Sequence, residues 1–323
     1  MSDWKIFKGD RQKKPMAINS LPAPPPWRSF TGKESVSSTQ KERRGKNFYP
    51  REDEIEMVNA ALYLRRPLLV TGKPGTGKTS LAYAITYELD LGEVLTWSIT
   101  TRSTLSQGLY SYDAVGRLQD AKLQGQDSHK RLGKYLRLGP LGTALLPTDK
   151  PRVLLIDEID KSDIDFPNDL LHVFEDGEYV IEELARIADE APTIDVQTAL
   201  RDEQEESYQE TVSIHKGLVR CTTFPLVIMT SNGERDFPPA FLRRCLRLDM
   251  GEPTPERLRD IIEAQLGKSL ADEAGKMIDD FDQKRRSGDG DLATDQLLNA
   301  VYLIGKEGAP EKLKEQLLQY LNR

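Results

Sequence analysis

Short apolar runs recur along the middle of the chain, each long enough for one buried strand. Apolar residues at helical spacing follow several of these runs. Buried strands that alternate with helices are typical of a parallel sheet covered on both faces. The pattern therefore predicts an α/β fold with a five-stranded parallel sheet and one helix, at residues 53–64, before it. The expected strands are residues 67–72, 94–99, 152–159, 224–232 and 245–250.

Beyond Pro253 the strand pattern stops and only helical periodicity remains. The stretches SGDGD and EGAP interrupt it, and glycine, proline and small polar residues of this kind end helices. We therefore expect an α/β domain over residues 48–252 and a small all-helical domain over residues 253–323. The expected helices of the second domain are residues 255–267, 270–286, 291–305 and 310–321.

Residues 1–47 are rich in Pro, Ser, Lys and Gln and show no sustained period of helix or strand. This composition favours an extended basic arm, which either lies along its own or a neighbouring subunit or remains a free tail. Residues 1–50 hold eleven Lys and Arg against four Asp and Glu, a charge of +7; since the whole chain carries −7, the remainder carries −14. An acidic body binds polyanions poorly, which argues against general nucleic-acid binding.

Composition also bears on location and on metal sites. No apolar run approaches the ~18 residues of a membrane span, and no apolar segment follows a basic start as in a secretory signal. A cytoplasmic protein without membrane contact is therefore expected. Cys221 and Cys245 have no further Cys or His at ligand spacing, so we expect reduced thiols rather than a zinc site or a disulfide.

The strongest chemical signal is the stretch LLVTGKPGTGKTSLAYA, in which G-x-x-x-x-G-K-T lies between a strand and a helix. Its glycines let backbone amides point inward at a phosphate, and the following helix adds its positive N-terminal end. Lys78 then supplies a charge for the β- and γ-phosphates, and Thr79 a hydroxyl ligand for Mg²⁺. The alternative is a surface turn. It is disfavoured because the complete G-x-x-x-x-G-K-T pattern lies between a strand and a helix. The expected nucleotide-binding residues are Gly72, Pro74, Gly75, Thr76, Gly77, Lys78, Thr79 and Ser80.

Two adjacent carboxylates, Asp157 and Glu158, end the apolar strand in RVLLIDEID. Phosphoryl transfer uses such a pair, because one carboxylate holds Mg²⁺ and the next polarises the attacking water. A polar loop after a core strand is the alternative. The pair follows the phosphate loop by about 80 residues, which favours a shared role in nucleotide chemistry.

Two further candidates follow the acidic strand. Asn232, in VIMTSNGE, has both a donor and an acceptor to orient the attacking water, although an Asn-Gly turn is the alternative. Arg243 and Arg244 stand just before the last strand, in PPAFLRRCLRLD. They are either a solvated basic pair or the source of an arginine finger, which would stabilise the transition state on a neighbouring subunit's nucleotide.

The phosphate loop, LLIDEID, SN and FPPAFLRRC, in that order and followed by a helical domain, resemble the AAA+ ATPases over about residues 50–310. The segment from STLSQGLYSYDAVGRLQDA to YLRLGPLGTALLP looks like the helix-two insertion of their MoxR branch. The resemblance implies a P-loop NTPase fold with a helical lid and Mg²⁺-dependent hydrolysis of ATP. It also implies a ring of subunits, a hexamer, with ATP bound between them.

The same resemblance assigns roles to single residues. It makes Lys78 and Thr79 the phosphate-loop ligands, Asp157 the metal ligand and Glu158 the base. It makes Asn232 the first sensor. Of the two arginines, Arg244 is the first candidate for the finger and Arg243 the second.

Two segments depart from the family pattern. The lid's third helix begins GDLATDQLL, with Thr294 and Asp295 where a second-sensor arginine is expected, which leaves Arg285 and Arg286 as candidate substitutes. Residues 178–223 are longer than a simple hairpin and include the acidic stretch RDEQEESYQE. This segment is expected either as an inserted hairpin, TVSIHKGLVRCT, with an acidic extension, or as a solvated loop.

The chain is therefore expected to be an ATP hydrolase that remodels or activates a partner protein. MoxR-like proteins act as chaperone-like activators, and some resemble components of prokaryotic antiviral defence. The alternative is an ATP-gated assembly platform or switch with weak hydrolysis that recruits an effector. The missing lid cation favours the switch, whereas the complete set of Asp-Glu, Asn and Arg favours the motor. A nucleic-acid motor, the third reading, rests on the basic arm alone.

Overall fold

The computed structural model describes residues 36–124, 132–201, 209–287 and 292–305, with a few positions nearer the N-terminus. It divides into two compact units. The α/β unit comprises Ser37–Gly72 and Lys78–Met250, and the helical unit comprises the described residues from Gly251 onward with the short loop Lys73–Gly77. Most of the predicted arm, the acidic residues 202–208 and the helix expected at residues 310–321 lie outside the described residues.

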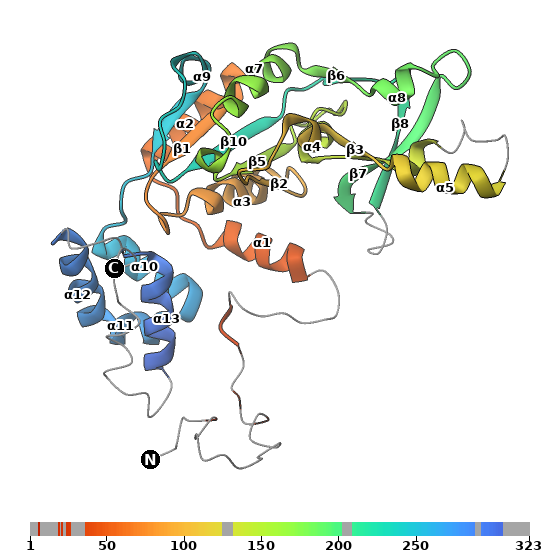
Figure 1. The fold of residues 1–323 in the computed structure, drawn as a ribbon. Coiled ribbons are helices and arrows are strands. Elements are labelled where there is room, and N and C mark those ends of the chain that lie inside the picture. Colours follow the sequence, from red (N-terminus) through yellow and green to blue (C-terminus); the bar gives the residue numbers. More distant parts are fainter. Residues whose placement is uncertain are drawn as a thin grey trace. The chain divides into compact units, whose positions relative to one another are not determined.

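The core of the α/β unit is a parallel sheet of five strands in the order β11-β1-β10-β5-β2. Figure 1 labels four of them, β1, β10, β5 and β2. Every residue of the central strand β10 is buried, as expected of a strand covered on both faces. The fold class and all five strands predicted from the apolar runs are therefore confirmed. The strands are β1 Leu68–Thr71, β2 Leu95–Ser98, β5 Val153–Asp157, β10 Leu226–Ser231 and β11 Leu246–Asp249.

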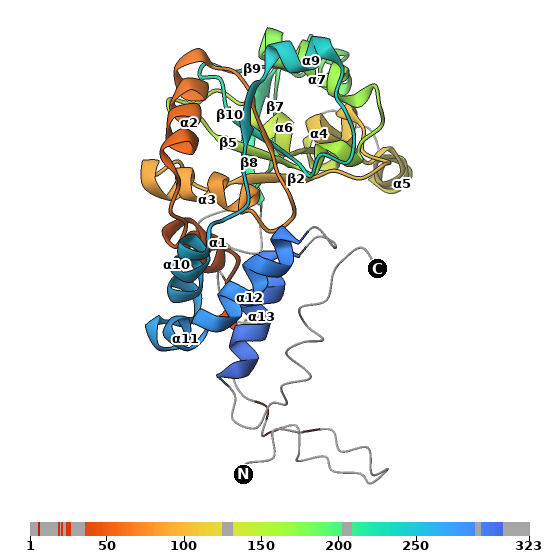
Figure 2. The same cartoon turned by 90° about the vertical axis from the view of Figure 1, so that its left-hand side faces the viewer.

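Successive residues of these strands face two separate hydrophobic cores, because strand side chains alternate between the faces of a sheet. Ile156 of β5 packs into one core and its neighbour Leu155 into the other. Helices cover each face, as Figure 2 shows from the side. The first face carries α6 Pro140–Ala144 and α7 Phe166–Asp176, and the second carries α2 Glu52–Leu64 and α3 Lys78–Leu89.

A second sheet, in the order β3-β4-β7-β8-β9-β6, unites the two inserted segments. The predicted hairpin of residues 211–222 is present as β8 and β9. Its turn residues Lys216 and Gly217 both have positive φ, 51° and 71°, as a two-residue hairpin turn requires. The sequence did not predict that β4 of the first insertion pairs with β7 of the second. The strands are β3 Tyr110–Tyr112, β4 Leu136–Leu138, β6 Glu178–Val180, β7 Thr193–Arg201, β8 Gln209–His215 and β9 Leu218–Arg220.

Short helices complete the α/β unit. One of them, α1 (Val36–Lys46), corrects the expectation that the whole arm up to residue 47 lacks a helix. Its residues are almost all polar, so no apolar stripe marks it in the sequence. It approaches α3 closely, because a Cβ on Gly45 would lie 2.4 Å from the Tyr83 carbonyl oxygen. The others are α4 Leu105–Leu109, α5 Ala114–Gln124, η3 Leu132–Tyr135, η4 Ile159–Lys161, α8 Glu182–Ala185 and α9 Pro239–Arg244.

The helical unit packs around its own apolar core, which includes Leu258, Phe281 and Leu297. The helix expected at residues 270–286 is in fact two, because the chain turns at Ala274 (φ −81°, ψ −3°), which is itself buried in that core. The described helices of this unit are α10 Pro255–Leu266, α11 Lys268–Glu273, α12 Gly275–Arg286 and α13 Thr294–Ile304. None of the helices in the described part of the chain is long and apolar enough to cross a membrane.

A buried arginine ties the start of the helical unit to its third helix. The Arg285 side chain is 6% exposed, donates to the Pro253 carbonyl and to Asp282 at 2.6 Å each, and pairs with Glu252 at 3.0 Å. Its guanidinium also lies 5.6 Å from the Phe281 ring centre. Arg286 pairs with the same Asp282 carboxylate at 2.7 Å but is 70% exposed. Both candidates for a lid cation are thus engaged within the helical unit.

Replacing Arg285 and Arg286 one at a time compares the stability contributed by a buried ion pair with that of an exposed ion pair to the same carboxylate, Asp282. Arg285→Met should destabilise the helical unit by about 3–5 kcal/mol, because it leaves buried acceptors unpaired. The matched control, Arg286→Met, should cost less than about 1 kcal/mol. Native-state hydrogen exchange of the amides of α10 and α12 measures both values. Equal losses in the two variants would contradict this account of Arg285.

Candidate active site

The phosphate loop predicted from the sequence joins the end of β1 to the start of α3. Gly72, Gly75 and Gly77 have φ angles of 150°, 80° and 98°, which glycine adopts without the steric cost of a Cβ. Thr76 closes the turn, its hydroxyl donating to the Lys73 carbonyl at 3.0 Å. A glycine turn that opens into a helix of this length presents backbone amides to a phosphate. Pro74 lies within the same turn, and Ser80 lies in the first turn of α3.

Lys78 is buried at the first position of α3. Its ammonium donates at 2.6 Å to the carbonyl of Gly72, the first glycine of the motif. Burial lowers the pKa of Lys78, and the nearby carboxylates of Asp160, Asp157 and Glu158 act in the opposite direction. A positive charge is therefore held where the loop would receive a phosphate, with acidic groups close by.

The two predicted metal ligands are in contact although 78 residues separate them. The Thr79 hydroxyl donates to Asp157 Oδ1 at 3.2 Å. Mg²⁺ prefers hydroxyl, carboxylate, phosphate and water oxygens as ligands. The pair therefore fits Mg²⁺, and the glycine loop with Lys78 fits a nucleotide's phosphates.

Glu158 follows directly and has an unusual backbone. Its φ and ψ are 59° and 49°, a left-handed conformation that costs a residue with a Cβ about 1–2 kcal/mol. The Glu158 amide donates to the Thr230 hydroxyl at 2.9 Å. Its carboxylate pairs with Lys161 at 2.7 Å, and both side chains are 41% exposed. The hydrogen bond to Glu158 raises the pKa of Lys161.

Asn232 stands immediately after β10, the strand that lies between β1 and β5. Because neighbouring parallel strands end at the same edge of a sheet, Asn232 lies between the phosphate loop and the acidic pair. The backbone amide of Asn232 donates to Asp160 Oδ2 at 2.8 Å, and the backbone amide of Glu234 donates to the same oxygen at 3.2 Å. The structure thus places the predicted loop, acids and asparagine at one edge.

Three residues of this cluster were missed by sequence reasoning: Thr230, Asp160 and Lys161. Thr230 is 1% exposed and its hydroxyl donates to Asp157 at 2.6 Å. The sequence carried a signal for it, since a polar residue at a buried strand position needs a partner. Asp160 and Lys161 directly follow the acidic pair, but their contacts depend on how the chain turns after β5.

Arg243 and Arg244 lie on α9, and within the described residues neither makes a contact with the phosphate loop or the acidic pair. Arg244 forms an ion pair with Glu175 of α7, in which both side chains are about half exposed. Arg66 holds this end of α9 by donating to the backbone carbonyls of both arginines. In the described part of the chain, the two arginines therefore make no contact with the predicted nucleotide-binding residues.

Cys245, next to this helix, is buried, and burial raises the pKa of its thiol to about 12.

In the helical unit, Thr294 and Asp295 open α13. No arginine stands at the position where the family pattern expects one.

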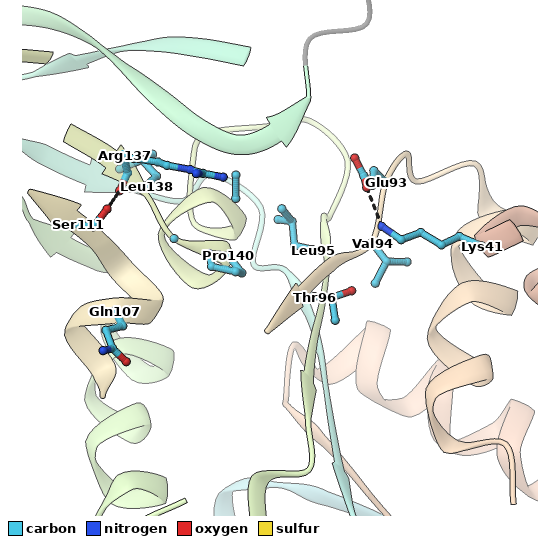
Figure 3. A pocket seen from close by; sticks show the side chains of 12 residues that line it. Lys41, Glu93, Val94, Leu95, Thr96, Gln107, Ser111, Arg137, Leu138 and Pro140 are labelled. Atoms are coloured by element: carbon cyan, nitrogen blue, oxygen red, sulfur yellow. Dashed lines mark hydrogen bonds and ion pairs between the residues drawn. The ribbon is translucent and has the colours of Figure 1, made fainter. Parts of the chain in front are cut away.

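A pocket of about 400 Å³ lies away from these residues, between β2 and the second sheet (Figure 3). Thr96, Arg137 and Pro140 line it, and Lys41 of α1 pairs with Glu93 at 2.7 Å along its rim. None of the predicted site residues lines it. The pocket is therefore a feature separate from the predicted site residues.

A family model described as AAA domain (dynein-related subfamily) matches residues 67–245, from the strand before the phosphate loop to the end of α9. No curated protein matches the chain. The matched region exceeds half of the chain and contains the loop, the acidic pair, Asn232 and both arginines. The chain therefore belongs to the AAA domain family, dynein-related subfamily, and is an AAA+ ATPase.

Proposed function

We propose that the protein is a MoxR-like AAA+ ATPase that hydrolyses ATP with Mg²⁺ in a ring assembly and so remodels or activates a partner protein. The observation that carries this proposal is the contact of Thr79 with Asp157, with the half-exposed Glu158 next in the chain. A pair of Mg²⁺ ligands beside a second carboxylate is the arrangement that phosphoryl transfer to water requires. It therefore supports hydrolysis as well as binding.

In this proposal the loop amides and Lys78 bind the phosphates of ATP. Thr79 and Asp157 would hold Mg²⁺, which neutralises charge on the phosphates when bound. Glu158 accepts the proton of the attacking water, and Asn232 orients that water. Each role uses a residue that lies at the carboxyl end of β1, β10 or β5, or at the start of α3.

The ring, a hexamer in this proposal, rests on the arginines and on the insertion. Arg244 lies outside the cluster of its own chain, as a finger that acts on a neighbouring subunit does. The antiparallel pair β3 and β4, followed by Gly139–Pro140, supports the MoxR-like assignment. Action on a partner protein, and a place in antiviral defence, extend the same likeness.

The second candidate function is an ATP-gated switch or assembly platform with weak hydrolysis. The observation that favours it lies in the helical unit, where Arg285 and Arg286 are engaged with Asp282 and α13 begins with Thr294 and Asp295. A lid without an arginine for the γ-phosphate would bind ATP and turn it over slowly. A nucleic-acid motor has the least support, because only the basic arm favours it and the rest of the chain carries a charge of −14.

Removing the base distinguishes hydrolysis from binding. Glu158→Gln keeps the shape of the side chain but accepts no proton, so phosphate release should slow at least ~100-fold while Mg²⁺-ATP still binds. Steady-state phosphate release and binding of a fluorescent ATP analogue measure the two effects. Lys78→Ala is the contrasting variant and should weaken binding itself.

Unchanged turnover in Glu158→Gln would remove this residue from the mechanism. If the unaltered protein binds ATP tightly but itself releases almost no phosphate, the switch is the better account.

Mixing two inactive variants tests whether the site is completed between subunits. Arg244→Ala should keep ATP binding but lose most of the ~10³-fold or greater gain that a finger provides. When Arg244→Ala subunits are mixed with Glu158→Gln subunits, some interfaces pair an intact base with an intact arginine. Phosphate release should then exceed that of either variant alone.

The comparison variant for this mixture is Arg243→Ala in place of Arg244→Ala. An Arg244 mixture that co-assembles, as seen by size measurement, yet stays as inactive as its parents would contradict action across the interface. Recovery only with Arg243→Ala would assign the finger to Arg243.

A further inference from the structure

The Thr230 hydroxyl joins the two carboxylate residues at the end of the neighbouring strand. It donates to Asp157 Oδ1 at 2.6 Å and accepts the Glu158 amide at 2.9 Å. Thr230 is 1% exposed and stands one residue before the end of β10. The same hydroxyl therefore donates to the proposed metal ligand, Asp157, and accepts from the backbone of the proposed base, Glu158.

Both contacts fix groups that would otherwise turn. Asp157 Oδ1 accepts from Thr230 and from Thr79, so its carboxylate is oriented from two sides. Glu158 has a left-handed backbone, which persists in a residue with a Cβ only when the surroundings hold it. The hydrogen bond from its amide to Thr230 is such a restraint.

A second side chain, that of Asp160, links the same two strands: it follows β5 and holds the segment after β10. Asp160, 5% exposed, follows the acidic pair and accepts the backbone amides of Asn232 and Glu234 on Oδ2. Its other oxygen, Oδ1, has no hydrogen-bond partner among the described residues. Thus β10 fixes the acids through Thr230, and the turn after β5 fixes the asparagine through Asp160.

We propose that Thr230 and Asp160 are positioning residues that hold Glu158 and Asn232 in one fixed geometry for hydrolysis. This inference rests on the proposed function, because it assigns Glu158 and Asn232 their roles. Neither positioning residue transfers a proton. Their effect is on the placement of the base and of the asparagine relative to the γ-phosphate.

Thr230→Val removes the hydroxyl while keeping the branched shape. Phosphate release at saturating ATP should fall on the order of 100-fold, the effect of misplacing a catalytic group, whereas ATP affinity should change little because the phosphate loop is untouched. Thr230→Ser restores the hydroxyl and should recover most of the lost rate. The matched control is Thr86→Val, since Thr86 is also a buried threonine, 8% exposed, but donates to the Ala82 carbonyl within α3. The rate of this variant should stay near that of the unaltered protein.

Combining substitutions shows whether Thr230 acts through the base. If it does, the double variant Thr230→Val with Glu158→Gln should be no slower than Glu158→Gln alone. Multiplying effects would overturn the inference, and so would a Thr230→Val rate equal to that of the unaltered protein while Glu158→Gln is slow. If Glu158→Gln itself keeps the full rate, the proposed function fails and the inference fails with it.

Asp160 gives the same test from the other strand, should Thr230→Val not fold. Asp160→Leu removes the acceptor of both amides, so phosphate release should fall while ATP still binds. Asp160→Asn keeps an oxygen at that place and should retain much more of the rate than Asp160→Leu. Equal rates in these two variants would overturn the assignment of Asp160.

Discussion

The arrangement of the site depends on one constraint: β1, β10 and β5 are adjacent, parallel and buried on both faces. Parallel neighbours end at the same edge of a sheet, so the segments that follow them meet there. The phosphate loop follows β1, the Thr230–Asn232 segment closes β10, and the acidic pair closes β5. The cores on the two faces hold this register, because a slip by one residue would turn Leu155 and Ile156 toward the wrong helices.

Within that edge, a few polar contacts determine what the residues are able to do. Asp157 accepts hydroxyls from Thr79 and Thr230, and Glu158 is held by its amide and by Lys161. Lys78 is buried and donates to the Gly72 carbonyl, and burial lowers its pKa against the opposite effect of the nearby carboxylates. Charges of both signs are thus held close together, which suits a site for phosphates and a divalent cation. The arginines of α9 belong to a different surface, where Glu175 is the partner of Arg244.

The sequence predicted what depends on local pattern. The five strands follow from apolar runs, and the loop follows from glycines that need positive φ. Helix α1 was missed because its residues are polar, and the break at Ala274 because the apolar period continues across it. The pairing of β4 with β7 was missed because it joins distant segments and β4 has only three residues. A polar residue in a buried strand signals that Thr230 needs a partner, but which partner it has depends on the register of two strands. The contacts of Asp160 and Lys161 depend on the turn after β5, which no local pattern encodes.

The central claim is that the residues at this edge of the sheet hydrolyse ATP with Mg²⁺. The unaltered protein tests this claim most directly. Phosphate release from ATP is followed as the protein concentration is raised, with Mg²⁺ present and then with the cation removed by a chelator. The account predicts turnover per subunit that rises as subunits assemble, levels off, and disappears with the cation. Tight ATP binding with no phosphate release at any protein concentration in the presence of Mg²⁺ would contradict it.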